Sequence, residues 1–397
     1  MTLRKILSRE FILCFLAQFA FTSVFHILVP TIPIYLSRLG STEVEIGILI
    51  GALGISSLIL RPIVGKKLSE IGEKKFMLVG ALLFAATSVA YIVAPPFWPL
   101  LFVRVFQGIG TAFFFTASIA LITHISPEAY RGQSLGYFFL SFNTSMALAP
   151  IIGMFLINQF SFDILFLVCT ALSLCSLWIA SKLSQKEPKP IDPLLMEAGS
   201  SLDFKTLSPI LLYFMVHMIF GALMAFFPLH AINQGVANPG LFFTAYAFVM
   251  ISGRVFGGRI FDAYQREKVI LPCIIAFIIA MSLLAFSKSL EMFILAAVIA
   301  AAGHAFLVPS LFAYVLDLVG PSHGPAIGWL TAMGDLGLGL GPMMMGVVLR
   351  LTNFPTMFLS LALTGLIGLA YFYLFVRGQL SHRAFRVLNG SFKTKGS

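Results

Sequence analysis

The chain has 397 residues, of which 59% are hydrophobic and only 11% are charged, and its formal net charge is +10. Soluble domains carry about 25% charged residues, so this composition excludes a soluble protein and indicates an integral membrane protein. The basic residues occur in short groups between apolar runs. We therefore interpret the positive charge as a membrane-topology signal and not as a nucleic-acid-binding surface.

Apolar runs between charged or turn-forming clusters predict twelve transmembrane helices, six before and six after a polar segment at 184–206. The predicted ranges are 11–36, 44–64, 76–94, 99–123, 134–158, 163–183, 207–232, 239–258, 269–287, 291–316, 325–350 and 355–376. The predicted domains are two all-α six-helix bundles at 1–183 and 207–376, a cytoplasmic linker at 184–206 and a basic cytoplasmic tail at 377–397. The first apolar run has no small-residue cleavage site, so it predicts a retained helix and not a signal peptide.

The distribution of Lys and Arg predicts the orientation of the chain in the membrane. With the N-terminus inside, almost all of these residues fall on the cytoplasmic side, and only Arg38, Lys288 and Arg350 fall outside. Both termini are therefore expected in the cytoplasm. The four cysteines have no metal-like spacing and predict neither a metal site nor a disulfide, and no cofactor is expected: Cys14, Cys169, Cys175 and Cys273.

The two halves of the chain repeat each other. The segment from Arg61 to Lys75 has the layout of the segment from Arg254 to Lys268: an Arg, a Gly four residues later, an acidic residue and a basic cluster. Further matches occur in the same order: Pro33 and Gly40 with Pro228 and Gly235, Gly110 with Gly303, and Ala149-Pro150 with Gly341-Pro342. Duplicated halves in an apolar chain are typical of transporters.

At these residues the chain resembles the major facilitator superfamily, and within it the twelve-helix exporters that exchange drugs or metabolites for protons. Arg104, Gln107 and the glycines that follow are similar to the family's R-x-x-Q-G-x-G segment. The glycine-rich exporter signature is matched in part by Gly136, Ser145, Ala149-Pro150 and Gly153, and more closely by Gly328, Gly337, Gly341-Pro342 and Gly346. The resemblance implies two six-helix halves that rock around a central cavity and open it to one side of the membrane at a time.

The family also has a loop of the form G-x-L-a-D-R-x-G-R-K after its second helix. Gly65 and Gly72 match its glycines, Ser69 stands at the acidic position, and Asp262 fills that position in the second copy. Glycines allow tight turns and close helix approach, so we expect a cytoplasmic gate in which Glu70 or Ser69 meets helix ends and Arg groups. The candidate gate residues are Arg61, Gly65, Ser69, Glu70, Gly72, Arg254, Gly258 and Asp262. For the neighbouring lysines, the alternative is a topology signal alone.

Gly-Pro pairs predict hinges in the helices at 134–158 and 325–350, because proline lacks an N–H and clashes with the preceding helical turn. The alternative is ordinary packing of small residues between helices. The candidate hinge residues are Ala149, Pro150, Gly153, Gly337, Gly341 and Pro342.

Ionisable residues inside the predicted helices mark the candidate cavity, since each costs about 2.5 to 3.5 kcal/mol at a helix centre. They lie on the four helices that the resemblance implies for the cavity wall, and several share a helix face with other polar residues. The candidate cavity residues are Gln18, Thr22, His26, Arg104, Gln107, Tyr213, His217 and His304. For each histidine, the alternative is a neutral ring bonded to a neighbouring helix.

Asp335 lies near the middle of the helix at 325–350, too far from either end for its side chain to reach water easily. A carboxyl group in a dry site can take a proton from one side of a membrane and release it on the other. Asp335 and Arg104 are therefore the candidate proton-coupling residues. The alternative is a neutral Asp335 that is hydrogen-bonded among neighbouring glycines.

We therefore expect a monomeric, multi-pass transporter of a bacterial inner membrane, whose partners are the lipid bilayer, protons and a small-molecule substrate, without nucleic acid. The expected activity is proton-coupled efflux of a small amphipathic organic compound. The alternative is uptake or uniport of a small organic anion or sugar-like metabolite. A membrane-embedded enzyme or receptor is the remaining alternative, but the sequence offers it no nucleophile triad, metal-ligand spacing or phosphate-binding loop.

Overall fold

The computed structural model describes residues 7–127, 130–184, 204–256, 265–319 and 324–377. These residues form twelve α-helices and one π-helical turn, η3, at Phe372–Val376, and they contain no strand. The helices are α2 (Arg9–Arg38), α3 (Glu43–Ile71), α4 (Glu73–Val93), α5 (Trp98–Ile125), α6 (Arg131–Gln159), α7 (Phe162–Ser181), α8 (Phe204–Asn233), α9 (Gly240–Phe256), α11 (Arg266–Phe286), α12 (Leu290–Val319), α13 (Gly324–Leu351) and α14 (Phe354–Tyr371). The predicted all-α fold is confirmed.

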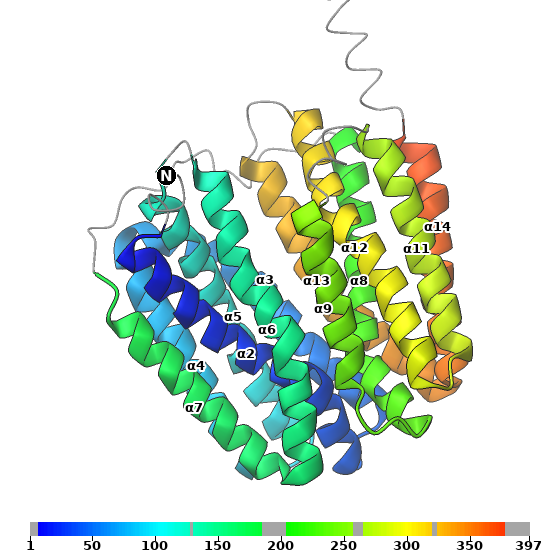
Figure 1. Cartoon of the computed structure of the whole chain (residues 1–397), viewed down its shortest axis with the longest axis horizontal. Coiled ribbons are helices and arrows are strands. Elements are labelled where there is room, and N and C mark those ends of the chain that lie inside the picture. Colours follow the sequence, from blue (N-terminus) through cyan, green and yellow to red (C-terminus); the bar gives the residue numbers. More distant parts are fainter. Residues whose placement is uncertain (1–6, 128–129, 185–203, 257–264, 320–323, 378–397) are drawn as a thin grey trace, which may run out of the picture.

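Eleven stretches of these helices are long and apolar enough to cross a membrane, and the described part of α9 is a shorter apolar helix. The chain is thus a multi-pass membrane protein. Figure 1 shows two groups of helices side by side, with α2 to α7 in one and α8 to α14 in the other. The first described helix, α2, begins at the same end of the molecule at which the last, α14, ends. We call that end the termini side and the opposite end the far side.

Matching glycines end α2 and α8 at the far side. Gly40 has a φ of 82° and Gly235 a φ of 80°, a left-handed conformation that glycine adopts without a Cβ clash. In both cases the next N–H donates back into the last helical turn, and both bonds are 3.0 Å long: Ser41 N to Leu36 O, and Val236 N to Ala231 O. The repeated glycines therefore make the same helix end in each half.

A second pair of matching glycines brings neighbouring helices close together. A Cβ on Gly110 of α5 would lie 3.1 Å from the carbonyl oxygen of Gly80 on α4. A Cβ on Gly303 of α12 would lie 2.8 Å from the carbonyl oxygen of Cys273 on α11. Both helix pairs are packed backbone to backbone at the same place in each half, which is the geometry that a duplication would leave.

The helix α3 differs from the sequence prediction, which ended it near residue 64. It continues as a helix to Ile71, and Gly72, with a φ of 86°, makes the turn into α4. Gly65 lies inside the helix, where a Cβ would meet nothing within 4 Å. Only Gly72 of these two glycines is therefore needed for the turn. The charged residues that follow Arg61, for which the sequence predicts a loop, form a helical extension of α3. The predicted domain boundaries remain a prediction, since 185–203 lies outside the described residues.

Candidate functional site

A cavity of about 260 Å³ lies between the two halves and is lined by residues of both. Most of its wall is apolar, and the aromatic part comes from α2, α5, α6, α8 and α9: Phe25, Phe115, Phe142, Phe220 and Phe243. The polar side chains in the wall are His26, Ser57, Arg61, Arg104, Gln107, Thr111 and Asp335. An apolar pocket with a few polar groups is the usual form of a small-molecule site.

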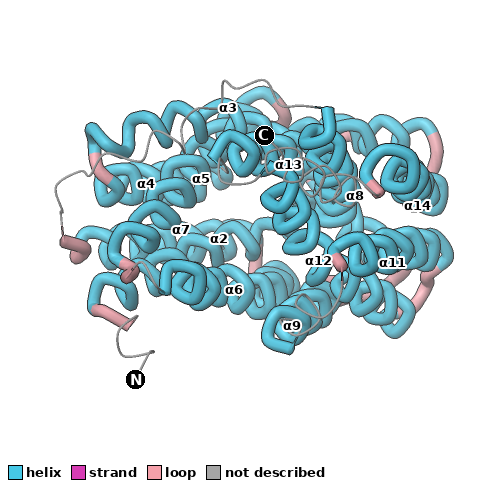
Figure 2. The backbone as a smooth tube through the Cα atoms, turned by 90° about the horizontal axis from the view of Figure 1, so that it is seen from above, coloured by secondary structure: helices cyan, strands magenta, loops and turns pink. Residues whose placement is uncertain are grey.

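Close contact between α3 and α13 joins the two halves on the far side of the cavity. A Cβ on Gly47 would collide with the carbonyl of Pro342, and one on Gly51 with the carbonyl of Gly339. One turn further, a Cβ on Gly54 would lie 3.1 Å from the carbonyl oxygen of Asp335. These contacts follow one antiparallel line along both helices, which Figure 2 shows side by side. We call this line the α3–α13 seam.

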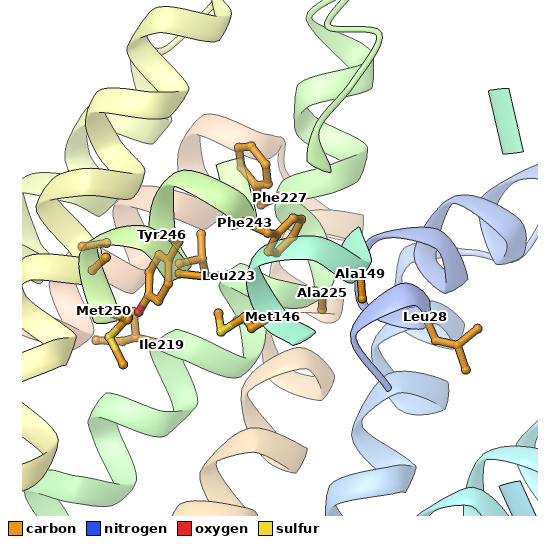
Figure 3. Close-up of a cluster of buried hydrophobic side chains, with 14 of the residues drawn as sticks. Leu28, Met146, Ala149, Ile219, Leu223, Ala225, Phe227, Phe243, Tyr246 and Met250 are labelled. Atoms are coloured by element: carbon orange, nitrogen blue, oxygen red, sulfur yellow. The ribbon is translucent and has the colours of Figure 1, made fainter. Parts of the chain in front are cut away.

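Contacts between α6 and α9 close the opposite edge of the cavity. The Thr244 hydroxyl donates to the carbonyl oxygen of Ala147 at 2.8 Å, and near the far side the Asn158 amide donates to that of Ala237 at 3.1 Å. Figure 3 shows the apolar cluster at this junction, in which Met146 of α6 is drawn among side chains of α8 and α9 that include Leu223, Ala225 and Tyr246. The two halves are thus joined on both edges of the far side.

Toward the termini side, α3 and α13 diverge. A Cβ on Gly65 of α3 or on Gly328 of α13 would meet nothing within 4 Å. Side chains on a helix point toward its N-terminus, so Arg61 reaches back along α3 toward the seam. Its Nε lies 2.7 Å from Asp335 Oδ2 and donates to the Ser57 hydroxyl at 3.3 Å. This ion pair joins the two halves where the helices begin to separate.

Arg104 of α5 lies in the cavity wall and is only 7% exposed. Its Nε donates to the carbonyl oxygen of Leu49 at 2.9 Å, and Nη1 donates to Gln107 Oε1 at 2.7 Å. Tyr91 donates to the same Gln107 oxygen at 2.8 Å. These partners are all neutral, and none of the ion pairs among the described residues includes Arg104. Neutral groups hold the guanidinium in place, and no described residue supplies a counter-charge to it.

Three polar residues of α2 share a helix face, as the sequence predicts, but they do different things. His26 lines the cavity, and its Nδ1 lies 2.8 Å from the Ser145 hydroxyl of α6. Thr22 accepts a hydrogen bond from the same Ser145, and Gln18 accepts one from Ser118 of α5. Gln18 and Thr22 therefore bind neighbouring helices of the first half and are not among the residues that line the cavity.

The polar residues predicted for the second half also lie between helices and not in the cavity wall. His304 of α12 meets the Tyr246 hydroxyl of α9 through Nδ1 at 2.6 Å. His217 meets the carbonyl oxygen of Tyr213 one turn earlier on α8 through Nδ1 at 3.0 Å. The two imidazole rings lie 6.1 Å apart. The structure thus places His26, Arg104 and Gln107 of the eight candidates in the wall.

The candidate gate residues do not come together as one group. Arg61 pairs with Asp335, whereas Glu70 pairs with Lys67 at 2.6 Å in an exposed contact within α3. Gly258 and Asp262 lie outside the described residues, as do the side chains of Ser69 and Arg254. The gate therefore remains a prediction for those four positions.

The candidate hinge glycines make close helix contacts. A Cβ on Gly153 of α6 would lie 2.9 Å from the carbonyl oxygen of Ile27, and one on Gly337 of α13 would lie 2.6 Å from that of Phe214. A Cβ on Gly341 would collide with the Met218 backbone on α8. The helices α6 and α13 continue without a break through the remaining candidate hinge residues, Ala149, Pro150 and Pro342. This geometry favours small-residue packing, the alternative given above, at the glycines.

One contact was not predicted from the sequence. Glu73, the first residue of α4, meets His124 near the end of α5, with Oε1 and Nδ1 2.5 Å apart. Glu73 follows Gly72 in the loop motif, at a position where the family has an arginine, and His124 belongs to no motif, so only the packing of α4 on α5 reveals the pair. Within the described residues, no three His, Cys, Asp or Glu side chains gather as metal ligands would.

Comparison with known proteins identifies the fold. The staphylopine export protein of Staphylococcus aureus (strain Mu50 / ATCC 700699) is 25% identical over 368 residues, covering 88% of this chain and 91% of that protein. The quinolone resistance protein NorA of Staphylococcus aureus (strain MSSA476) is 23% identical over 335 residues, covering 81% and 85%. Both relatives carry the names of export or resistance proteins.

Solved structures of the same fold cover nearly the whole chain. The nucleoside transporter NupG superposes with a TM-score of 0.74 at 15% identity, covering 92% of this chain and 99% of that one. The human organic anion transporter MFSD10 (TETRAN) superposes with a TM-score of 0.68 at 16% identity, covering 92% and 99%. The model of the Major Facilitator Superfamily matches residues 14–236 and 209–386. With two helical halves around a central cavity, this chain belongs to the Major Facilitator Superfamily and is a membrane transporter of small molecules.

Proposed function

We propose that this transporter exports a small amphipathic organic compound in exchange for protons, and that Asp335 carries the proton. The observation that carries the proposal is the ion pair between Asp335 of α13 and Arg61 of α3, 2.7 Å long and placed in the cavity wall. Among the described lining residues Asp335 is the one carboxylate. The names of the similar Staphylococcus proteins support export as the direction.

The ion pair links the protonation of Asp335 to the contact between the halves. A charged Asp335 holds Arg61 at the point where α3 and α13 diverge. A proton on the carboxylate removes the charge that holds the guanidinium, and the link across the two halves is lost. One chain contains the whole cavity and both partners, so a monomer suffices for the cycle.

The basic residues support an orientation with the termini side in the cytoplasm. The described residues place Arg38, Lys288 and Arg350 toward the far side and these toward the termini side: Arg9, Lys66, Lys67, Lys74, Lys75, Lys182, Arg266, Lys268 and Arg377. With the far side closed by the α3–α13 seam, the described state would face the cytoplasm, where an exporter loads its substrate.

The test measures binding and gradient-driven flux separately in the purified protein. A panel of metabolites and dyes is screened for thermal stabilisation, and the strongest stabilisers are followed in proteoliposomes with an imposed pH step. Asp335→Asn is expected to abolish gradient-driven flux while binding remains. Glu43→Gln is the matched control, because Glu43 also pairs across the halves, with Arg350 at 3.5 Å, but at the exposed far-side end. Gradient-driven flux that persists in Asp335→Asn would contradict the proton-carrier role.

A further inference from the structure

We propose that the cavity binds an organic anion, a small and mostly apolar molecule with one carboxylate group that is held by Arg104 and Gln107. This inference names the substrate class of the proposed export function and in that sense rests on it. It depends on three features of the cavity wall: the charge balance, the orientation of the donors at Arg104, and the distance from Arg104 to the ion pair of Arg61 with Asp335.

The charge balance of the wall leaves one positive charge over. The charged residues among the described lining residues are Arg61, Arg104 and Asp335, and the first and last of these neutralise each other. Arg104 has only neutral partners although it is 7% exposed. A buried charge without a counter-charge is unfavourable. A ligand that brings a negative group to this position would supply the missing partner.

The donors at Arg104 are already oriented for such a group. Tyr91 and Arg104 both donate to Gln107 Oε1, which fixes the amide so that its Nε2 is the remaining donor. Among the described residues, none accepts a hydrogen bond from Gln107 Nε2, and Arg104 Nη2 donates only to the Ile50 carbonyl oxygen, at 3.4 Å. A carboxylate beside Arg104 would receive charge-assisted hydrogen bonds from both groups.

The anion site lies well apart from the carboxylate of Asp335. Arg104 donates to the carbonyl oxygens of Leu49 and Ile50 on α3. Arg61, which belongs to α3 itself, donates to Ser57, seven residues beyond Ile50. Seven residues of α-helix rise about 11 Å. The wall between the two ends is lined by aromatic and aliphatic side chains. A molecule with its carboxylate at Arg104 and an apolar body toward Ser57 therefore keeps its charge away from Asp335.

The test compares carboxylates with amides of the same shape. The probes are 4-phenylbutyrate against 4-phenylbutyramide and 1-naphthylacetate against 1-naphthylacetamide, measured by equilibrium dialysis with the full-length protein in detergent. The wild type is expected to bind the carboxylate about 10- to 100-fold more tightly than the amide. Arg104→Gln is expected to reduce carboxylate binding to the level of the amide. Arg350→Gln, which changes an exposed arginine far along the same seam, is expected to keep the preference.

A second variant guards against an effect of misfolding. Gln107→Glu keeps the shape of the side chain and gives Arg104 a carboxylate within the protein, so it is also expected to abolish the preference. Unchanged amide binding in either variant shows that the cavity is intact. Equal binding of carboxylate and amide by the wild type in both pairs would overturn the proposal, and so would a preference that survives in both variants.

The dialysis measurement uses no gradient, so its result tests the anion site independently of the proposed export. A preserved anion preference without gradient-driven flux would contradict only the export proposal. Gradient-driven flux of neutral compounds, without any anion preference in binding, would contradict only the present inference.

Discussion

Glu73 stands at the first position of α4, where two favourable interactions coincide. Its carboxylate meets His124 at 2.5 Å, and the free N–H groups of a helix N-terminus attract negative charge. The side chains are 11% and 26% exposed, so water screens the contact only in part. Glu70, in the last turn of α3, pairs with Lys67 at nearly the same distance, but those side chains are 61% and 51% exposed.

The two glutamates therefore predict different effects on stability. Glu73→Gln is expected to lower the free energy of unfolding by about 1.5 to 3 kcal/mol, because it removes a charged hydrogen bond from a partly buried site. Glu70→Gln is expected to cost less than about 0.5 kcal/mol, as is usual for exposed pairs. Denaturant unfolding of both variants in the same detergent compares the two costs. Similar costs for the two substitutions would show that burial does not strengthen the Glu73 contact.

Single residues also show what helical periodicity in the sequence can predict about the cavity. The four-residue spacing of Gln18, Thr22 and His26 puts them on one face of a helix, and the structure agrees. The spacing cannot tell what that face meets, and only His26 reaches the cavity, while the other two bind helices of their own half. Arg104 and Gln107 are identifiable from their motif, but the α3 carbonyl that Arg104 binds and the α4 tyrosine that shares Gln107 depend on the packing.

At the scale of elements, the close approach of α3 and α13 depends on positions without side chains. Gly47 and Gly51 face backbone carbonyls of Pro342 and Gly339, so the helices touch through their main chains. Small residues permit such contacts between helices in a membrane. Toward the termini side the same two helices diverge, and Gly65 faces open space. Substitutions along α3 should therefore act on the far side only where the helices meet.

Gly51→Ala is expected to separate the seam, because the new methyl group would meet backbone atoms that cannot move aside as a side chain would. Overpacking typically costs about 1 to 3 kcal/mol, which would favour states with an open far side about 5- to 150-fold. The measurement is maleimide labelling of Thr244→Cys, at the α6–α9 contact, after the native cysteines are replaced by serine. Gly65→Ala serves as the control and should leave the labelling rate unchanged. Equal labelling in both variants would rule out this role for the seam.

The limits of sequence prediction at this scale are clear in α3. Charged residues after Arg61 suggested that the helix ends near residue 64, but it continues to Ile71. Charge shows where a helix leaves the apolar part of a membrane, and a helix can continue beyond that point. The helix ends at Gly40 and Gly235, in contrast, were marked by residues whose backbone conformation requires glycine.

The two halves of the whole molecule meet through contacts that no local pattern reveals. The composition and the spacing of apolar runs were sufficient to predict the twelve helices and their division into two groups. Arg61 and Asp335 were also singled out, but for separate roles, because nothing in the sequence pairs residues so far apart in the chain. Their pairing depends on the arrangement of α3 and α13, which lie side by side in the fold.

The charge of the substrate decides how transport by the whole molecule responds to membrane potential. If one proton enters on Asp335 while one monoanion leaves, each cycle moves two elementary charges. Each charge is worth about 2.3 kcal/mol per 100 mV, so a change of about 60 mV is expected to alter the steady-state concentration ratio of an anion about 100-fold. A neutral substrate would give about 10-fold and a monovalent cation no change. Potassium diffusion potentials across proteoliposomes measure this ratio directly, and a ratio independent of potential would contradict anion exchange.

The α3–α13 seam also has a consequence for the resting cell. Protons cross a protein quickly along connected water molecules, and a contact with no space for a methyl group has none for a file of water either. The main chains of α3 and α13 thus form an insulator along the seam, with no path for water between these two helices. Such an insulator does not depend on side chains that change rotamer. A protein that waits for substrate in this state gives protons no route to the cavity between α3 and α13.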